Sequence, residues 1–518
     1  MNAVTERPLH WDPFNQEYYP NPYPVYKRLR AEAPIYYNDE FGFYAVSRYD
    51  DVRRVLSDRD TFISGRGDVY EHIKSNTKIP RGMFIAEDPP LHTVHRGVLT
   101  RVFTPKRMSA LEPHIRKFCA LALDPLVAGG EFDFVEDLGQ EMPMRVIGML
   151  LGIPDQDLQT IRQRVDDTHY VEPGKPKDMK DTNFVGHHYD DYIKWREKSP
   201  SNDLMTELLN VEFVDELGVK RKLERQEILM FVTVLAAAGN ETTNRLIGWI
   251  GKVLAQHPEQ RRQVYENRAL IPQTIDEILR FEPPGPCISR YVARDAEFHG
   301  RVVPEGSIVI AIGAAASRDE NKFAAGETFN IHRQQVPHLS FGFGFHNCLG
   351  NALARVEGRV ALDEILNRFP EWDVDLKQAY LSPSSTTRGY KKLPAYTPYA
   401  KRGTRKPKAS AAAPAPQAAP AGAERWTLTM ATPAGPQEME AYFVRDGAAL
   451  TGRIEGKMGS MPVIDGAVAG DDLSWAIEVS QPMPMKISFK AKQQRDTLFG
   501  TAKLGMFGDA NLAGTRKA

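Results

Sequence analysis

A run rich in proline and alanine divides this chain into two parts of different composition. From Pro407 to Ala423 the sequence contains no large apolar side chain that could anchor a hydrophobic core. Such a composition predicts a partly extended, semi-rigid linker. We therefore expect two domains, residues 1–400 and residues 425–518, joined by a linker over residues 401–424. Charge follows the same division, because the part before the linker carries a net charge of −6 and the chain beyond it, linker included, carries +5.

The first domain has the pattern of a mainly α-helical fold with small β-sheets. Apolar residues recur at the three- and four-residue spacing of a helix in the segments Ser109–Val127, Gln140–Leu151, Gln226–Leu254 and Leu349–Phe369. Shorter strand-like segments are Phe43–Val46, Tyr291–His299 and Ser307–Ala311. The regular βαβ alternation of a Rossmann or barrel enzyme is absent, which disfavours both of those folds.

The second domain alternates short strand-like stretches with turns that contain Gly, Asp or Pro. The predicted strands are Trp426–Met430, Met439–Val444, Ala448–Ile454, Leu473–Val479, Met485–Lys492 and Thr497–Leu504. Short strands at regular spacing are typical of a small antiparallel β-barrel or sandwich. We expect this domain to have an accessory role in self-association, partner docking or substrate delivery.

The charge and cysteine content exclude several classes of protein. The whole chain of 518 residues has a net charge of −1, which gives no support for nucleic-acid binding by bulk electrostatics. Its three cysteines are too few for a disulfide scaffold or a four-cysteine metal site, and they fit a reducing, cytoplasmic location. The longest apolar stretch, Ile228–Gly239, has twelve residues, whereas a membrane span needs about 20, so we expect no membrane span.

The segment Phe341–Gly350, with the sequence FGFGFHNCLG, is the most specific feature of the first domain. Its glycines allow the backbone to approach a flat, bulky ligand. Cys348 falls where a helix is predicted to begin, and the free N–H groups and the dipole of a helix start favour a thiolate. A lone cysteine is usually a buried structural residue, so this interpretation depends on the spacing of the whole segment.

This segment resembles the haem-ligand loop of the cytochrome P450 superfamily, because every fixed position of Phe-Gly-x-Gly-x-His/Arg-x-Cys-x-Gly is present. The resemblance implies a cytochrome P450-like fold for the first domain and haem b as its cofactor. It also implies that Cys348 supplies the thiolate that ligates the haem iron, with Phe341 and Gly350 against the haem.

A second segment, Ala238–Thr243, places an acid and hydroxyl groups inside an apolar helix, where unpaired polar groups are costly. Taken alone, it is as readily explained as a helix end or a solvated turn. It resembles the oxygen-activation segment of the same superfamily. The resemblance implies that Thr242 and Glu241 organise proton delivery and that Gly239 leaves room for the oxygen.

Four basic side chains match the family's partners for the haem propionates. His92 and Arg96 lie four residues apart on a predicted helical face. The other two are Arg290, ahead of a predicted strand, and His346, just before the cysteine. Buried carboxylates need cationic or hydrogen-bonding partners of this kind. Each residue alone is more often a surface or capping residue, so the prediction rests on their joint occurrence.

A further match is structural rather than catalytic. Glu277 and Arg280, three residues apart on a predicted helix, would form an ordinary helical ion pair if considered alone. Together with Arg333 they resemble the buried ion-pair triad of the superfamily. The resemblance implies a role in bracing the core.

The resemblance implies a haem-thiolate monooxygenase that inserts one atom of O₂ into an apolar organic substrate. The residues expected to line the substrate pocket are apolar, namely Val234, Ala237, Phe84, Ile85, Pro286 and Ile288. The sequence does not specify the substrate. Two alternatives stay open, a peroxygenase driven by H₂O₂ and a non-catalytic haem sensor or ligand carrier.

Electrons are expected to come from a separate protein. The chain beyond residue 400 is too short for a flavodoxin-like module and has no cysteine for an iron–sulfur cluster. A ferredoxin and its reductase are the expected partners, and NAD(P)H would act only through them. The basic residues expected to contact the ferredoxin are Arg101, Lys106, Arg107 and Arg355.

Overall fold

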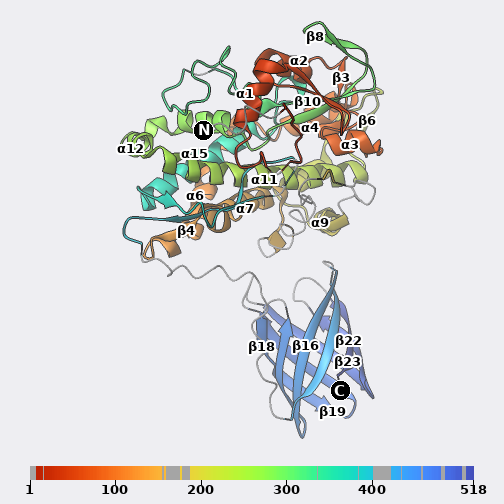
Figure 1. Cartoon of the computed structure of the whole chain (residues 1–518). Coiled ribbons are helices and arrows are strands. Elements are labelled where there is room, and N and C mark those ends of the chain that lie inside the picture. The colour runs from red at the N-terminus through yellow and green to blue at the C-terminus, as the bar shows by residue number, and fades with distance from the viewer. Residues whose placement is uncertain are drawn as a thin grey trace. The chain divides into compact units, whose positions relative to one another are not determined.

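The structure is a computed structural model that describes residues 8–15, 17–154, 157, 158, 161, 175–177, 187–334, 336–382, 384, 386–400, 422–432, 435–456, 459–479, 485–503 and 509–517. These residues form two compact units, the first before residue 401 and the second after residue 421 (Figure 1). Most of the linker predicted over residues 401–424 therefore lies outside the described residues, and Glu424 already belongs to the first strand of the second unit.

The first unit is built mainly of helices. The longer ones are α1 (Tyr23–Glu32), α2 (Tyr49–Ser57), α4 (Leu91–Thr100), α6 (Glu112–Leu123), α7 (Met142–Leu151), α9 (His187–Lys198), α11 (Arg225–Gln256), α12 (Pro258–Glu266), α13 (Ile271–Phe281) and α15 (Asn351–Arg368). Short helices are α3 (Tyr70–Ser75), α5 (Pro105–Ser109), α10 (Leu204–Asn210), α14 (Gly313–Ala316), η1 (Phe84–Ala86), η2 (Asp124–Leu126), η3 (Phe134–Gly139), η5 (Arg268–Leu270) and η6 (Gly344–His346). All four helices predicted from apolar spacing are confirmed, as α6, α7, α11 and α15.

Helix α11 crosses the first unit and has 32 residues (Figure 1). It begins with a capping box in which the side chains of Glu224 and Glu227 each accept a hydrogen bond from the other residue's backbone N–H. Most of its side chains are buried, and it packs against α7, α13 and α15 around the main hydrophobic core. Among the described helices, none combines the length and the apolar character needed to cross a bilayer.

A mixed sheet of five strands forms the other main element of the first unit. Its order is β1 (Ile35–Asn38), β2 (Phe43–Val46), β10 (Ile308–Ala311), β7 (Ile288–Val292) and β3 (Phe62–Ile63). Only β2 and β10 pair in parallel within this sheet, and the other pairs are antiparallel. Smaller sheets contain β4 (Glu131–Asp133), β5 (Glu212–Val214), β6 (Lys220–Lys222), β8 (Ala296–Phe298), β9 (Arg301–Val303), β11 (Asp373–Val374), β12 (Tyr380–Leu381), β13 (Tyr390–Lys392) and β14 (Pro394–Tyr396).

The strands predicted over Phe43–Val46 and Ser307–Ala311 are confirmed, but the single strand predicted over Tyr291–His299 is wrong. The chain leaves the five-stranded sheet after Val292, and β8 then pairs with β9 in a separate hairpin. The break falls at Asp295, whose side chain accepts a hydrogen bond from the backbone N–H of Glu305.

The second unit is a closed antiparallel barrel. Its strands are β15 (Glu424–Thr432), β16 (Gly435–Asp446), β17 (Ala449–Gly456), β18 (Gly459–Pro462), β19 (Ile464–Ala469), β20 (Asp472–Val479), β21 (Met485–Gln494), β22 (Thr497–Lys503) and β23 (Asp509–Arg516). Eight of them pair in a ring that β16 and β17 close, and short β18 pairs with β17. All six predicted strands are confirmed, whereas β18, β19 and β23 were not expected.

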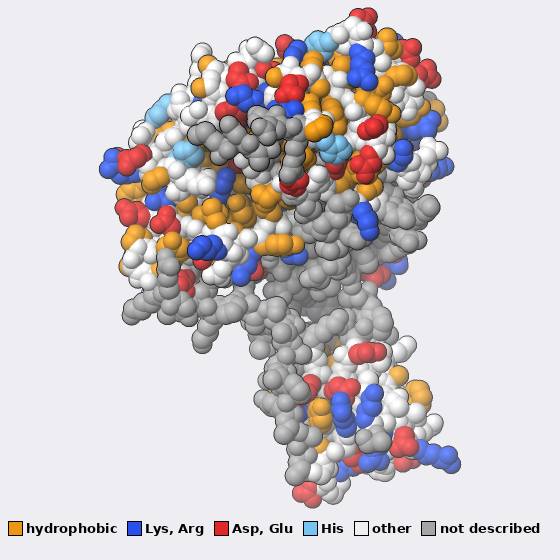
Figure 2. All heavy atoms as spheres, viewed as in Figure 1, with side chains coloured by type: hydrophobic (Ala, Val, Ile, Leu, Met, Phe, Trp, Pro, Cys, Tyr) orange, Lys and Arg blue, Asp and Glu red, His pale blue; other side chains and the backbone are white. Residues whose placement is uncertain are grey.

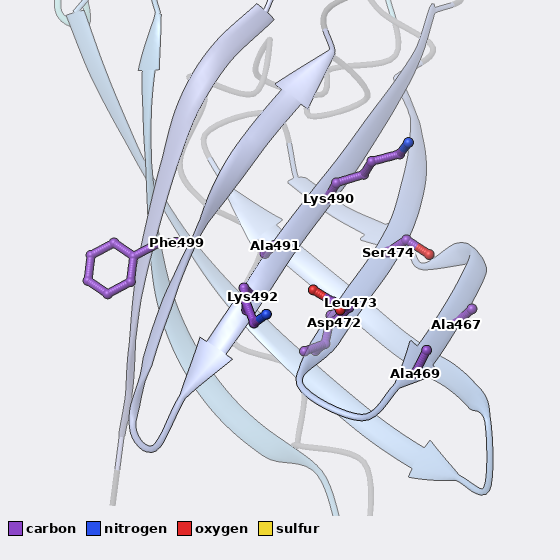
Figure 3. Close-up of a pocket in the computed structure, with 9 residues that line it drawn as sticks. All are labelled: Ala467, Ala469, Asp472, Leu473, Ser474, Lys490, Ala491, Lys492 and Phe499. Carbon is purple, nitrogen blue, oxygen red and sulfur yellow. The ribbon is translucent and has the colours of Figure 1, made fainter.

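The interior of the barrel is filled by apolar side chains, among which the ring of Trp475 stacks on that of Phe489 with centroids 5.0 Å apart. A pocket of about 390 Å³ lies over β19 to β22 (Figure 3). Exposed Lys490, Lys492 and Phe499 contribute to its lining, so it opens on the outer surface of the barrel rather than into its core. On the visible face of both units, acidic and basic side chains are intermixed (Figure 2).

Candidate functional site

The segment Phe341–Gly350 forms a tight loop at the start of α15. Gly342 and Gly344 have φ values of +70° and +72°, which side chains other than glycine rarely adopt. The backbone N–H of Cys348 donates to the carbonyl of Phe341 over 2.8 Å and closes the loop. Because Gly350 has no side chain, nothing at that position covers the sulfur; a Cβ built there would lie 4.0 Å from the Cys348 Sγ.

The surroundings of the Cys348 thiol act on its charge in two directions. Burial raises the pKa of the thiol, and the backbone N–H of Gly350 with the charges of Arg96 and Arg355 lowers it. The N–H group at the helix start is therefore aimed at the sulfur, but burial is the larger influence and the pKa of the thiol lies above its ordinary value. Among the described residues, no disulfide involves Cys348, so the sulfur is a free ligand atom.

The four basic residues predicted to hold propionates lie together beside this loop, although they come from α4, β7 and the loop itself. The rings of His92 and His346 have centroids 4.0 Å apart. Arg96 donates to the carbonyl of Asn347, the residue before the cysteine. Burial lowers the pKa of His92 to about 4 and that of His346 to about 2, and the charges of Arg96 and Arg290 act in the same direction. Both histidines are therefore neutral at pH 7.

The charges of Asp68 and Asp88 act on Arg290 in this cluster, but in the described part of the chain neither carboxylate forms an ion pair with it. Arg290 is 3% exposed and donates to the carbonyl of its neighbour Ser289, and within the described residues neither Arg290 nor Arg96 has a carboxylate ion-pair partner. The Nε2 atom of His92 is buried without a hydrogen-bond partner. Buried cations and donors without counter-charges are costly. A flat ligand with two carboxylates, such as haem, fits these residues.

Helix α11 presents one unusually open turn near its middle. Ala238 is exposed in a helix that is otherwise largely buried, and the hydroxyl of Thr242 donates to the Ala238 carbonyl over 2.9 Å. Thr242 thus caps a carbonyl of its own helix. Gly239 instead faces α7, because a Cβ built there would lie 3.1 Å from Ile147 Cδ1. The room that Gly239 makes is thus used for helix packing, and Ala238 is the open position.

Glu241 is buried and engaged on both sides. Its carboxylate pairs with Arg245 one turn later and accepts a hydrogen bond from the Thr387 hydroxyl over 3.3 Å. Arg245 in turn donates to the carbonyl of Tyr390 over 2.5 Å. The acid beside Thr242 is therefore part of an ion-paired group.

A second buried acid near this turn was missed by the sequence reasoning. Glu357 of α15 is 1% exposed, and one of its oxygens accepts a hydrogen bond from the Thr243 hydroxyl over 3.0 Å. Its other oxygen has no hydrogen-bond partner. Burial raises the pKa of Glu357 to about 8. A Glu on the apolar face of the helix that follows the cysteine is the signal that could have identified it.

The residues predicted to line a substrate pocket are placed on three segments. Phe84 lies in η1 and meets Phe231 of α11 edge-on, with centroids 5.7 Å apart. Ile288 lies against the cysteine loop, since a Cβ on Gly342 would be 3.8 Å from its Cδ1 atom. Phe84 and Val234 are buried, whereas the half-buried members are Ile85, Ala237, Pro286 and Ile288.

The structural triad is confirmed as a set of contacts. Arg280 donates two hydrogen bonds to Glu277 over 2.7 and 2.8 Å. Arg333 donates to the same carboxylate over 3.1 Å. The triad ties α13 to the segment that leads into the cysteine loop, and it fixes the direction from which that loop arrives.

Comparisons with known proteins agree with this geometry. A sequence model of the family described as "Cytochrome P450" matches residues 144–387. "Putative cytochrome P450 123" of Mycobacterium tuberculosis is 34% identical over 397 residues, which cover 76% of this chain and 98% of that protein.

Solved structures show the same likeness. CYP109E1 from Bacillus megaterium, solved with testosterone, has a TM-score of 0.67 at 28% identity and covers 74% of this chain and 99% of that chain. CYP109Q5 from Chondromyces apiculatus has a TM-score of 0.65 at 32% identity over 74% of this chain and 97% of that chain. The family consists of monooxygenases that carry haem b on a cysteine thiolate. This chain therefore belongs to the cytochrome P450 family.

Proposed function

We propose that the Cys348 thiolate would hold the haem iron and that the enzyme oxidises an apolar organic substrate with electrons from a separate ferredoxin system. The observation that carries this proposal is the position of the Cys348 sulfur, which lies at the start of α15 within reach of the charge of half-buried Arg96. Buried Arg290 lies near His92, and among the described residues neither arginine forms an ion pair with a carboxylate. The haem, when bound, supplies the iron chemistry that inserts one oxygen atom of O₂ into the substrate.

In this proposal, the chain's own residues bind and orient the cofactor. Arg96 and Arg290 neutralise the two propionates, and the neutral ring of His92 donates a hydrogen bond to one of them. The neutral ring of His346 gives its one proton to the Glu87 carbonyl and packs against His92 at the edge of the same site. Two residues border the cofactor on the side of the sulfur. The ring of Phe341 lies under the Arg355 guanidinium at 4.5 Å, and Gly350 presents backbone without a side chain.

Proton handling is proposed for the open turn of α11. Because the Thr242 hydroxyl gives its proton to the Ala238 carbonyl, its oxygen is left to accept a hydrogen bond from water or ligand. The neighbouring residue Glu241 is held in position by its ion pair with Arg245 and its hydrogen bond from Thr387, so its carboxylate is available to take part in proton transfer. Glu357, whose pKa is raised to about 8, carries a proton at neutral pH and reaches the same turn through Thr243.

An apolar substrate is supported by the character of the proposed lining residues, which offer carbon surface and few polar atoms. The relative CYP109E1 was solved with testosterone, so a steroid-sized apolar molecule is a suitable first probe. Both the substrate class and its site of oxidation belong to the proposal.

A separate electron donor is supported by the barrel unit, whose sequence has no cysteine for an iron–sulfur cluster. Of the proposed ferredoxin contacts, Arg107 pairs with Glu207 and Arg355 with Asp276. Arg101 and Lys106 are exposed and form no ion pair among the described residues, so they are the better docking candidates. Three cysteines without a disulfide in the described structure support a cytoplasmic location, which is also proposed.

The test is the spectrum of the reduced carbon monoxide complex, together with turnover assays. The wild-type protein and Cys119→Ala should show the strongly red-shifted band of a thiolate-ligated haem, and Cys348→Ser should not. Product should form with ferredoxin, its reductase and NAD(P)H. Product formed with H₂O₂ alone would favour the peroxygenase, and ligand-dependent spectra without any product would favour a sensor or carrier.

A further inference from the structure

His95 is a histidine that the proposed chemistry does not use, and it is completely buried between two carboxylates. Its Nδ1 atom lies 2.8 and 3.0 Å from the two oxygens of Glu87. Its Nε2 atom lies 3.2 Å from an oxygen of Glu227. The two carboxylates approach opposite ends of the ring, so both ring nitrogens are engaged.

This geometry determines the protonation state of the ring. An ionised carboxylate only accepts hydrogen bonds, so both nitrogens of His95 have to donate, which requires the imidazolium form. Burial opposes that charge, but the hydrogen bonds to Glu227 and Glu87 outweigh it and raise the pKa of His95 above its ordinary value. The same contacts and two arginines hold the pKa of Glu227 far below its usual range.

The surrounding charges make the imidazolium part of a nearly balanced cluster. On the far side of Glu227, Arg81 and Arg221 donate to its carboxylate over 2.7 to 2.8 Å. These arginines also pair with Glu216 and Asp215, respectively. On the helix of His95 itself, His92 and Arg96 are the other ionisable neighbours. When His95 is charged, the cluster holds three cations, namely His95 and the two arginines, against the four carboxylates of Glu87, Glu227, Glu216 and Asp215. When His95 is neutral, only the two arginines balance these carboxylates.

Through these contacts, His95 joins three parts of the first unit. Glu87 ends the segment Arg81–Glu87, and one of its oxygens also accepts the backbone N–H of Gly82 over 2.8 Å. A Cβ on Gly82 would lie 2.8 Å from Glu227 Cα, so this segment rests directly on the first turns of α11. The carbonyl of Glu87 meanwhile accepts a hydrogen bond from His346 Nε2 over 3.0 Å, in the cysteine loop.

The same histidine also packs against the apolar residues Phe231 and Phe84, which form a wall of the proposed substrate pocket. The His95 ring meets Phe231 edge-on at 5.2 Å, and Phe231 meets Phe84 at 5.7 Å. Phe84 lies in the very segment that Glu87 anchors. Deprotonation of the His95 ring would release one carboxylate from it. The ring contacts of His95 with Phe231 and of Phe231 with Phe84 would then loosen.

We propose that His95 is a positioning residue, whose imidazolium clamps the segment Arg81–Glu87 onto α11 and so determines how tightly the enzyme holds an apolar ligand. This inference rests on the proposed function, because Phe84 and Ile85 are assigned there to the substrate pocket. The clamp is present at low pH and is lost as the pH rises through the pKa of His95, because a raised pKa means that the proton stabilises the folded arrangement. Ligand affinity should therefore fall on the alkaline side.

The experiment compares two nitrogen ligands of the haem iron in the full-length holoenzyme. Pyridine reports on the iron alone, whereas 4-phenylpyridine adds an apolar ring that contacts the pocket wall. Both ligands are unprotonated between about pH 6.5 and about pH 9.5, so their own titration does not affect the ratio of their Kd values. That ratio therefore measures how well the apolar residues of the pocket hold the added ring. Spectral titrations give both constants across this range.

We define the preference as the Kd of pyridine divided by the Kd of 4-phenylpyridine. In the wild type, this preference should fall about tenfold as the pH rises. His95→Gln should show the low preference at every pH, because its amide is neutral and cannot hold both carboxylates as a cation. Glu87→Gln should retain the preference at low pH but lose it with a midpoint lower by about one pH unit, because one anion is gone. His299→Gln, which removes a surface histidine paired with Asp51, is the matched control and should behave as the wild type.

Two results would overturn the proposal. One is a preference in His95→Gln equal to that of the wild type at low pH. The other is a preference independent of pH in both the wild type and Glu87→Gln, which also keeps the test valid if His95→Gln does not fold. Failure of pyridine itself to bind, or a carbon monoxide spectrum without thiolate character, would count against the proposed function instead.

Discussion

Arg96 donates a hydrogen bond from its guanidinium to the carbonyl oxygen of Asn347, the residue that immediately precedes Cys348. One side chain from α4 thereby fixes the backbone beside the proposed iron ligand, and its charge lowers the pKa of the thiol. With Arg96 on a propionate as proposed, this contact would couple the binding of the cofactor to the orientation of the sulfur.

Replacing Arg96 with Ala should therefore weaken haem binding and thiolate ligation together. Loss of a charge-assisted hydrogen bond costs about 1.5–3 kcal/mol, so haem affinity should fall at least about tenfold. The haem-to-protein ratio and the carbon monoxide spectrum measure both effects. Arg101→Ala removes an exposed arginine one residue beyond the same helix and should leave both unchanged. Full haem content in Arg96→Ala would contradict the assignment.

Thr242→Ala should separate electron consumption from product formation. Without the hydroxyl, proton delivery is impaired, and we expect product per NAD(P)H to fall about tenfold or more while electrons are lost to peroxide or water. Thr233→Ala is the matched control, because Thr233 donates to the Leu229 carbonyl four residues back on the same helix over 2.7 Å. Equal loss of coupling in both variants would show that the effect comes from the helix rather than from the hydroxyl.

Glu357 should make the stability of the first unit depend on pH. Its pKa is raised from 4.5 to about 8, so between these values the folded protein holds a proton that the unfolded chain has released. Stability should fall over that interval as pH rises, by about 1.4 kcal/mol per pH unit from this group. Glu357→Gln removes the titration and should flatten the dependence of Tm on pH, whereas exposed Glu371→Gln should not. An unchanged slope in Glu357→Gln would refute the buried, protonated state.

Removal of residues 405–518 should leave the haem unit intact. We expect the carbon monoxide spectrum and the Kd for pyridine to stay within about twofold of those of the full chain, because the two units have separate hydrophobic cores. A barrel expressed alone from residue 422 should give the circular dichroism of a folded β-protein. Loss of haem from the shortened protein would show that the domains predicted from the sequence depend on each other.

Much of the fold could be predicted because periodic apolar spacing and turn residues are local signals. Helix α11 was placed to within two residues at each end, and β2 was placed without error. Strand β23 escaped prediction because its sequence, rich in Ala, Gly and Asn, has few of the β-branched and aromatic residues that favour strands. It is a strand because β15 and β22 pair with it on both sides.

The candidate site divides in the same way. Cys348 and the four basic residues belong to segments whose spacing could be identified, and the structure brings them together from α4, β7 and the cysteine loop. The place of Glu357 on an apolar helix face was a local signal, but its partner Thr243 and the Glu227 partner of His95 could not be predicted, because each lies more than 100 positions away in the sequence. The close approach of Gly239 to Ile147 of α7 could not be predicted either, since it depends on helix packing that spacing does not reveal.

Closure of the barrel by β16 and β17 limits how the second unit can meet other molecules. In an open sheet, the outermost strand offers a row of free N–H and C=O groups to which a foreign strand can add. In the described ring, those groups are engaged by neighbouring strands of the same chain. Association through the eight-stranded ring therefore depends on side chains, so its specificity can be redesigned by surface substitution without changing the backbone pairing. Among the described strands, short β18 pairs on one side only, with β17, and it is the edge to which a foreign strand could add.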